Sequence, residues 1–134
     1  MKTTEIGNYL IKQLKANGFI IQYYKAVTSN SIYLKLDYGV ANSVRISDHK
    51  GKSHLHYRYN LCSHHQKFSA SKTHRDLQRY FYPFEQVDTL VALIVKERNE
   101  KLVKYGRDRY IGFIKKNITE KQNTQGFWAE AQLI

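Results

Sequence analysis

The middle of the chain alternates apolar and polar residues three times in close succession, and this pattern constrains the fold more than any other. The alternation covers residues 31–37, 43–48 and 53–61, and a run rich in aromatic and branched residues, 19–27, precedes it. Period-two alternation is typical of half-buried β-strands, and Tyr38-Gly39 and residues 49–51 supply turn chemistry between the runs. Because short connections join antiparallel neighbours, the sequence predicts an antiparallel sheet of three to four strands.

Helical patterns flank these strands on both sides. Near the start, apolar residues recur at every fourth position, Thr3 or Thr4 could cap the helix, and an Asn-Gly pair could end it. After the break at Pro83, helical spacing predicts the longest helix as far as Gly106, and a shorter helix over residues 108–117.

The pattern as a whole predicts one α+β domain over residues 1–134, a length that suits a single core. Its expected parts are an N-terminal helix (1–18), the sheet (19–61), a basic loop with a short helix from Thr73 (62–82), and a helical segment with an apolar tail (83–134). We expect the tail to dock onto its own core or onto a second copy. The long helix could also mediate a homodimer.

Positive charge is concentrated in residues 45–79. This stretch contains all six histidines, eight Lys or Arg and two Asp, so it contributes +6 of the chain's net charge of +11. Like charges repel one another in a compact state, and such a field therefore indicates a polyanionic partner, most often nucleic acid.

Strand alternation assigns the basic and aromatic residues of the sheet to one face. The residues predicted on this face are Tyr33, Lys35, Arg45, His54, His56 and Arg58. The short helix could add Lys72, Arg75 and Arg79, and a second cluster could come from Arg107 and Arg109. Cations attract phosphates and flat rings stack on bases, so we expect this surface to bind nucleic acid, a ribonucleoprotein or a nucleotide ligand, without a cofactor.

A metal site is an alternative interpretation of the histidines. His54 and His56 point the same way from one strand, and Cys62 or His64 in the next loop could complete a tetrahedral site. The spacing matches no established zinc module, and neighbouring cations would disfavour a metal ion. The sequence therefore favours histidines that supplement a basic surface.

Catalysis is a second alternative. Asp37 and Asp48, with Lys50 nearby, could hold Mg²⁺ at adjacent strand ends, and a pair such as His54 and His64 could cleave RNA without metal. Asp48 is better explained as the first residue of an Asx-type turn, and no spacing selects one histidine pair. The sequence favours a binding protein over an enzyme.

The lone Cys62 allows no intrachain disulfide, which fits a reducing compartment. The N-terminal segment lacks the apolar core of a signal peptide, and the longest apolar run, residues 90–95, is far below the roughly 20 residues of a membrane span. A cytoplasmic protein without a membrane partner is expected.

One segment carries a resemblance. SIY at residues 31–33 and VRISDH at residues 44–49 make the segment 31–61 similar to small uncharacterised proteins from phages and prophages of Gram-positive bacteria. Proteins of that kind include inhibitors of host immunity, such as anti-CRISPR proteins, and sponges for nucleotide signals. The resemblance implies a phage accessory role in the host cytoplasm and supplies no catalytic residues. An inhibitor that binds a host defence protein directly, and a small nuclease, stay open as alternatives.

Overall fold

The computed structural model describes residues 2–27, 29–48, 51–58, 80–120 and 126–134. In chain order its elements are α1 (Thr3–Ala16), β1 (Ile21–Lys25), β2 (Ile32–Leu36), the 3-10 turn η1 (Asp37–Gly39), β3 (Ser43–Ser47), β4 (His54–Arg58), β5 (Tyr80–Tyr82), η3 (Phe84–Gln86), α3 (Val87–Tyr105), α4 (Arg107–Thr119), η4 (Gly126–Glu130) and β6 (Gln132–Leu133). The predicted α+β class, with an N-terminal helix and C-terminal helices, is confirmed.

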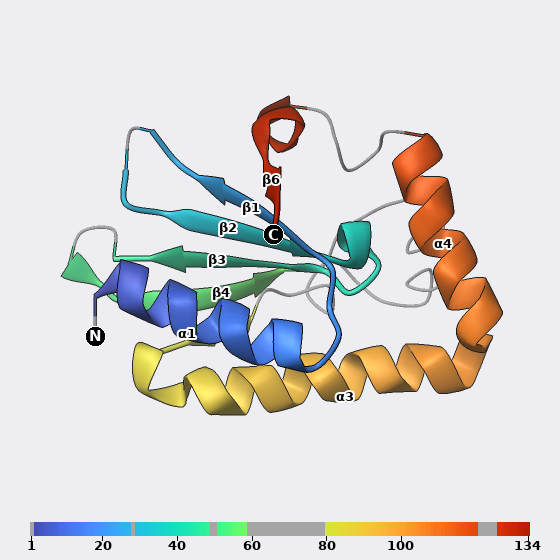
Figure 1. Ribbon diagram of the computed structural model, residues 1–134. Helices are drawn as coiled ribbons and strands as arrows, with labels where there is room; N and C mark the ends of the chain where they lie inside the picture. Colours follow the sequence, from blue (N-terminus) through green and yellow to red (C-terminus); the bar gives the residue numbers. More distant parts are fainter. Residues whose placement is uncertain (1, 28, 49–50, 59–79, 121–125) are drawn as a thin grey trace.

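Within the described residues, six strands form one antiparallel sheet in the order β5-β4-β3-β2-β1-β6 (Figure 1). The prediction of three to four strands was therefore too low. The short helix expected from Thr73 reached Tyr80, but Tyr80 begins β5, and residues 80–82 pair with β4 instead. The remainder of that expected helix lies outside the described residues. The apolar tail supplies the other missing strand, because β6 pairs with the edge of β1.

Helix α1 forms where the fourfold apolar spacing predicted it, but its cap differs. The residue before the helix is Lys2, which makes no capping hydrogen bond through its side chain, and Thr3 is already a buried helical residue. The expected stop is confirmed: Gly18 adopts a φ of 83°, which a residue without a Cβ reaches without strain.

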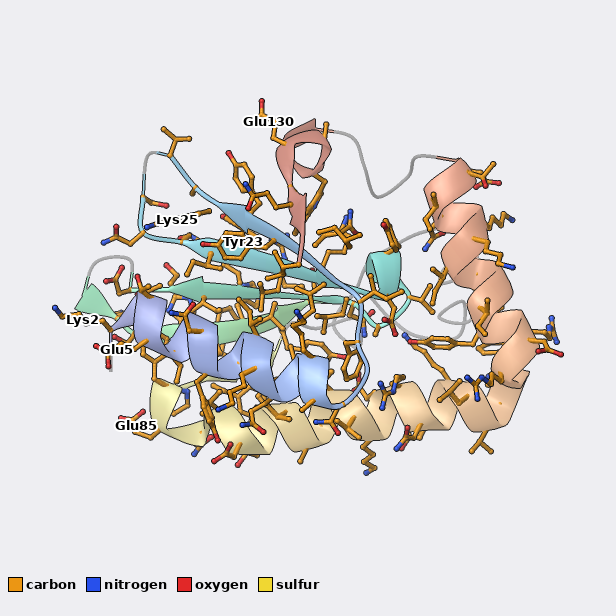
Figure 2. All side chains as sticks on the ribbon, in the orientation of Figure 1. Lys2, Glu5, Tyr23, Lys25, Glu85 and Glu130 are labelled. Atoms are coloured by element: carbon orange, nitrogen blue, oxygen red, sulfur yellow. The ribbon has the colours of Figure 1, made fainter. Side chains whose placement is uncertain are left out.

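The core lies between one face of the sheet and the two helices α1 and α3, where side chains fill the space between the layers (Figures 1 and 2). It combines apolar residues of α1, of β1–β4 and of α3, including Leu10, Leu34 and Leu90, all fully buried. Gly7 brings α1 close to the sheet, since a Cβ there would lie 3.0 Å from Cδ1 of Ile32.

The C-terminal helices follow the predicted order. The long α3 ends at Gly106, whose φ of 82° turns the chain directly into α4. In Figure 1, α4 rises from the end of α3 along the edge of the molecule where β2 leads into η1. Among the helices that the structure describes, none is both long and apolar enough to cross a membrane.

Candidate functional site

The sheet has a second face, which the helices α1 and α3 leave uncovered. Since neighbouring residues on a strand point to opposite sides, the apolar residues that face the helices place their polar neighbours on this other side. We call it the polar face; on β1–β5 it consists of Gln22, Tyr24, Tyr33, Lys35, Ser43, Arg45, Ser47, His54, His56, Arg58 and Phe81. Among these described strand residues there is no acid.

One row of the polar face crosses five strands. The register pairs its members directly with one another, in the order Tyr24, Tyr33, Arg45, His56 and Phe81. The rings of Tyr24 and Tyr33 are 6.3 Å apart between centroids, and the guanidinium carbon of Arg45 lies 5.7 Å from the centroid of the Tyr33 ring. At the other end of the row, His56 and Phe81 stack at 4.1 Å with 17° between their planes.

Hydroxyl groups hold Arg45 within this row. Its Nη2 donates to Oγ of Ser31 at 3.3 Å, and the hydroxyls of Ser31 and Ser47 are 3.3 Å apart. Within the part of the chain that the structure describes, Nε of Arg45 has no hydrogen-bond partner. The protein acceptors described therefore satisfy only part of the donor capacity of this guanidinium.

A second row contains Lys35, and the C-terminal segment covers it. The Nζ atom of Lys35 lies 4.4 Å from the ring centroid of Trp128 in η4, and the lysine is only 4% exposed. The same Trp128 ring meets Tyr33 edge-on at 6.4 Å. The tail thus docks on its own chain and encloses a cation that strand alternation alone would place in solvent.

The structure brings the six predicted strand residues together on one face, but not equally near the surface. Lys35 and His56 are buried, whereas the other four strand residues are half-buried. Lys72, Arg75 and Arg79 lie outside the described residues. Arg107 and Arg109 are exposed in the first turn of α4, a helix that follows α3 directly and is separate from the strands (Figure 1).

Phe81 and Trp128 are the site residues that sequence reasoning missed. The alternation of Tyr80, Phe81 and Tyr82 was a signal for β5, but a run of three residues does not distinguish a strand from a helix end. The aromatic tail signalled docking, yet nothing in the sequence indicated the face to which Trp128 docks.

A second group of buried polar residues lies where β2 ends. The carboxylate of Asp37 accepts hydrogen bonds from the backbone N–H of Ile20 at 2.8 Å and from the hydroxyl of Tyr110 at 2.5 Å. Burial raises the pKa of the Asp37 carboxyl, against the opposing effect of both hydrogen bonds. Burial together with the neighbouring Asp37 also raises the pKa of the Tyr110 hydroxyl.

Two further bonds fasten the helices to the same turn. Nζ of Lys101 in α3 donates to the carbonyl of Val40 at 2.6 Å, and Nδ2 of Asn117 in α4 donates to the carbonyl of Tyr38 at 2.9 Å. The buried residues Asp37, Lys101, Tyr110 and Asn117, together with the backbone carbonyl of Tyr38, form what we call the buried polar cluster. It anchors α3 and α4 to the end of the sheet.

The geometry contradicts the two-acid magnesium site. β2 and β3 run antiparallel, so Asp37 after β2 and Asp48 after β3 lie at opposite ends of the sheet. Five strand residues separate those ends by about 16 Å, too far for one metal ion to bridge. The backbone carbonyl of Asp48 accepts a hydrogen bond from the N–H of Gly51 at 2.9 Å. This bond is made by the backbone, whereas the Asx-type turn that the sequence favoured would use the side chain of Asp48 and stays a prediction.

For the metal alternative, the structure places His54 and His56 beside the Phe81 ring, at 5.7 and 4.1 Å between centroids. Within the described ranges, no three His, Cys, Asp or Glu side chains are grouped as metal ligands. Cys62 and His64 lie outside these ranges.

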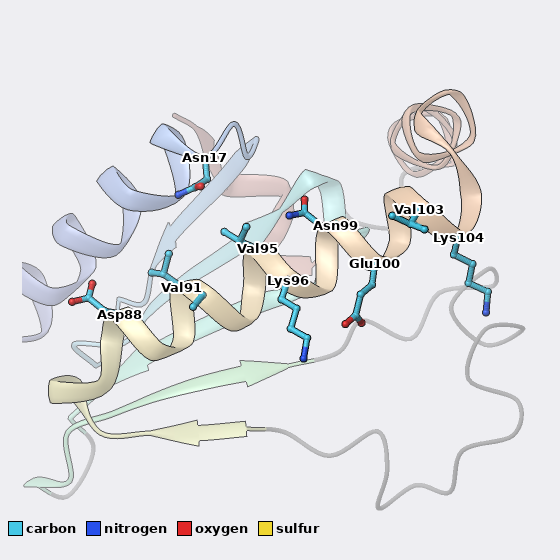
Figure 3. Close-up of a pocket in the computed structure, with 10 residues that line it drawn as sticks. Asn17, Asp88, Val91, Val95, Lys96, Asn99, Glu100, Val103 and Lys104 are labelled. Carbon is cyan, nitrogen blue, oxygen red and sulfur yellow. The ribbon is translucent and has the colours of Figure 1, made fainter.

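A shallow depression of about 830 Å³ lies on the outer side of α3, beside the end of α1 (Figure 3). Its lining includes Val91, Val95 and Val103, with Lys96 and Glu100 beside them. The homodimer expected through this helix stays a prediction, because nothing in the structure indicates what covers the depression.

No protein-family model, curated protein or solved structure matches this chain.

Proposed function

We propose that this protein is a phage-type accessory protein that binds a phosphate-rich partner through the polar face. The partner would be nucleic acid, a ribonucleoprotein or a nucleotide signal. The observation that supports this proposal most strongly is the composition of the face: Arg45, His54 and Arg58 share it with aromatic rings, and its described strand residues include no acid.

The accessible part of the face suits this role physically. Arg45 and Arg58 are half-buried, so each keeps part of its side chain in contact with solvent while the sheet fixes its position. A guanidinium presents several N–H donors in a planar fork that matches two oxygens of a phosphate. Lys35 lies beneath Trp128 and would contribute to the field of the face without contacting the ligand.

The anti-defence setting follows from the resemblance of residues 31–61 to phage and prophage proteins. A chain that binds nucleic acid or a nucleotide signal could act there by sequestering what a defence system detects. The net charge of +11 would also accelerate its encounter with a polyanion.

The decisive experiment reverses charge on the polar face and compares it with the same change elsewhere. The double variant Arg45→Glu/Arg58→Glu is expected to lose binding to labelled DNA and RNA in a gel-shift assay across a salt series. Its control is Lys12→Glu/Lys96→Glu, which makes the same change in net charge at exposed positions of α1 and α3. Circular dichroism checks that both variants fold.

Equal loss of binding in the two double variants would mean that net charge, and not this face, holds the partner. Degradation of the labelled strand would indicate the nuclease alternative. Binding to a host defence protein without affinity for any nucleic acid or nucleotide would indicate a direct inhibitor.

A further inference from the structure

The edge of the polar face carries an exposed ring. Phe81 lies on β5, the last strand on that side of the described sheet, and 63% of it is exposed. Its inner face stacks on His56, while Tyr82, its neighbour on the strand, packs against the core. The stack with His56 covers one face of the Phe81 ring, and most of the remaining ring surface is open to a partner.

Phe81 belongs to a line of rings that a cation interrupts. Tyr24, Tyr33 and His56 are the other rings of the row, and Arg45 lies between Tyr33 and His56. Adjacent strands are about 4.8 Å apart, so the row extends about 19 Å across the sheet. An extended chain of nucleotides also alternates flat rings with anionic groups, and base-stacking surfaces of this kind are sequence-tolerant.

The shape of the face disfavours a duplex. Six strands make a surface about 24 Å wide, whereas the major groove of B-form DNA is about 12 Å wide and admits one helix or a two-stranded ribbon. In a duplex the flat faces of the bases are stacked on one another, and only their edges reach the grooves. A platform of rings can therefore stack only on bases that are unpaired.

We infer that the polar face binds single-stranded nucleic acid, with Phe81 stacking on an unpaired base and Arg45 contacting a phosphate of the same strand. This inference rests on the proposed function and specifies the form of its partner. It also assigns to Phe81 a binding role that charge alone would not reveal.

The test compares four probes: a labelled thymidine oligonucleotide, the uridine oligonucleotide of equal length, the duplex of the first with its complement, and inorganic polyphosphate. Both single strands are expected to bind more tightly than the duplex. Phe81→Leu should weaken binding of the single strands about tenfold, the size of one lost base stack, and leave polyphosphate binding and the salt dependence unchanged. Phe81→Tyr, which keeps the ring, should bind as the unaltered protein does.

Two further variants separate stacking from charge and from general packing. Arg45→Gln should weaken binding to every probe and lower the salt slope for single strands by about 0.7. Phe113→Leu repeats the loss of a ring in α4 and should leave binding to all probes unchanged. Ultraviolet crosslinking of the thymidine oligonucleotide to the unaltered protein, followed by mass spectrometry, should place an adduct on β5, and this readout needs no variant to fold.

A duplex that binds as tightly as the single strands would overturn the inference while the proposed function survives. Unchanged binding in Phe81→Leu, or a crosslink that maps only to the helices α1 and α3, would overturn it as well. Failure of all four probes to bind would instead contradict direct nucleic-acid recognition, and with it both proposals for this ligand class.

Discussion

The hydroxyl of Tyr110 donates a hydrogen bond of 2.5 Å to the buried carboxylate of Asp37, and this bond joins α4 to the turn that follows β2. The chain contains a second bond of the same chemistry: the hydroxyl of Tyr9 donates to Asp88 at 2.6 Å, but in an exposed position. The two pairs differ mainly in their access to water. They therefore allow the effect of burial to be measured within one protein.

Removing the buried hydroxyl should be the more damaging change. Tyr110→Phe leaves a carboxylate oxygen of Asp37 without its donor in a place that water reaches poorly, and we expect the free energy of unfolding to fall by about 2 kcal/mol. Tyr9→Phe leaves Asp88 without this donor, but water can replace it. We expect this variant to change the free energy of unfolding by less than about 0.5 kcal/mol. Urea denaturation of both variants measures the difference, and equal losses would show that burial does not increase the contribution of the hydrogen bond between Tyr110 and Asp37.

Asp37 should also make stability depend on pH. Its pKa is raised in the folded protein above the ordinary value of 3.8, so its contribution to stability is fully present below that value and is lost as the pH rises through the folded pKa. Asparagine does not titrate. The unfolding free energy of the unaltered protein should therefore fall relative to that of Asp37→Asn as the pH increases from about 4, and then become parallel to it.

Denaturation curves at closely spaced pH values, collected for both proteins at one ionic strength, would show this difference. The comparison removes the effect of the large positive net charge, which both proteins share at low pH. A constant difference at every pH would mean that the pKa of Asp37 is the same in the folded and unfolded chains.

The sequence predicted those elements that bury a periodic set of side chains. α1 has Ile6, Leu10 and Leu14 on one side, and β2 has Ile32 and Leu34 on one face, so their periods reflect the core directly. The same alternation correctly grouped six basic and aromatic residues on the opposite face of the sheet. Local periodicity was sufficient because each of these elements packs against the core along most of its length.

Contacts between distant segments could not be predicted in this way. β5 and β6 contain three and two residues, too few to show a period, and they are strands only because β4 and β1 offer them backbone partners. The contact between Lys35 and Trp128 likewise joins distant segments, because Trp128 approaches from the far end of the chain. Tyr110 gave no sign of its partner, because helical spacing does not specify which carboxylate a buried hydroxyl will reach.

The turn after β2 contains backbone strain that substitution can measure. Tyr38 has a φ of 53°, in the left-handed region that disfavours residues with a Cβ. Tyr38→Gly and Tyr38→Ala both remove the ring, but only glycine accepts this conformation freely. We expect the glycine variant to be the more stable by about 1 kcal/mol in thermal or urea unfolding. The opposite order would mean that the turn changes conformation once the ring is removed.

Trp128 should control the chemical accessibility of Lys35. The lysine is 4% exposed beneath the indole, whereas Lys12 on α1 is exposed. A water-soluble acetylating reagent should therefore modify Lys12 rapidly and Lys35 slowly in the unaltered protein. In Trp128→Ala the rate of modification at Lys35 should approach that at Lys12, as peptide mass spectrometry would show. Removing the cation–π contact should also lower the free energy of unfolding by about 1–2 kcal/mol.

Leu133→Ala on β6, an exposed tail residue, is the control and should leave Lys35 protected. Slow modification of Lys35 in Trp128→Ala would show that other parts of the chain cover the lysine and that the tail does not close this side of the polar face.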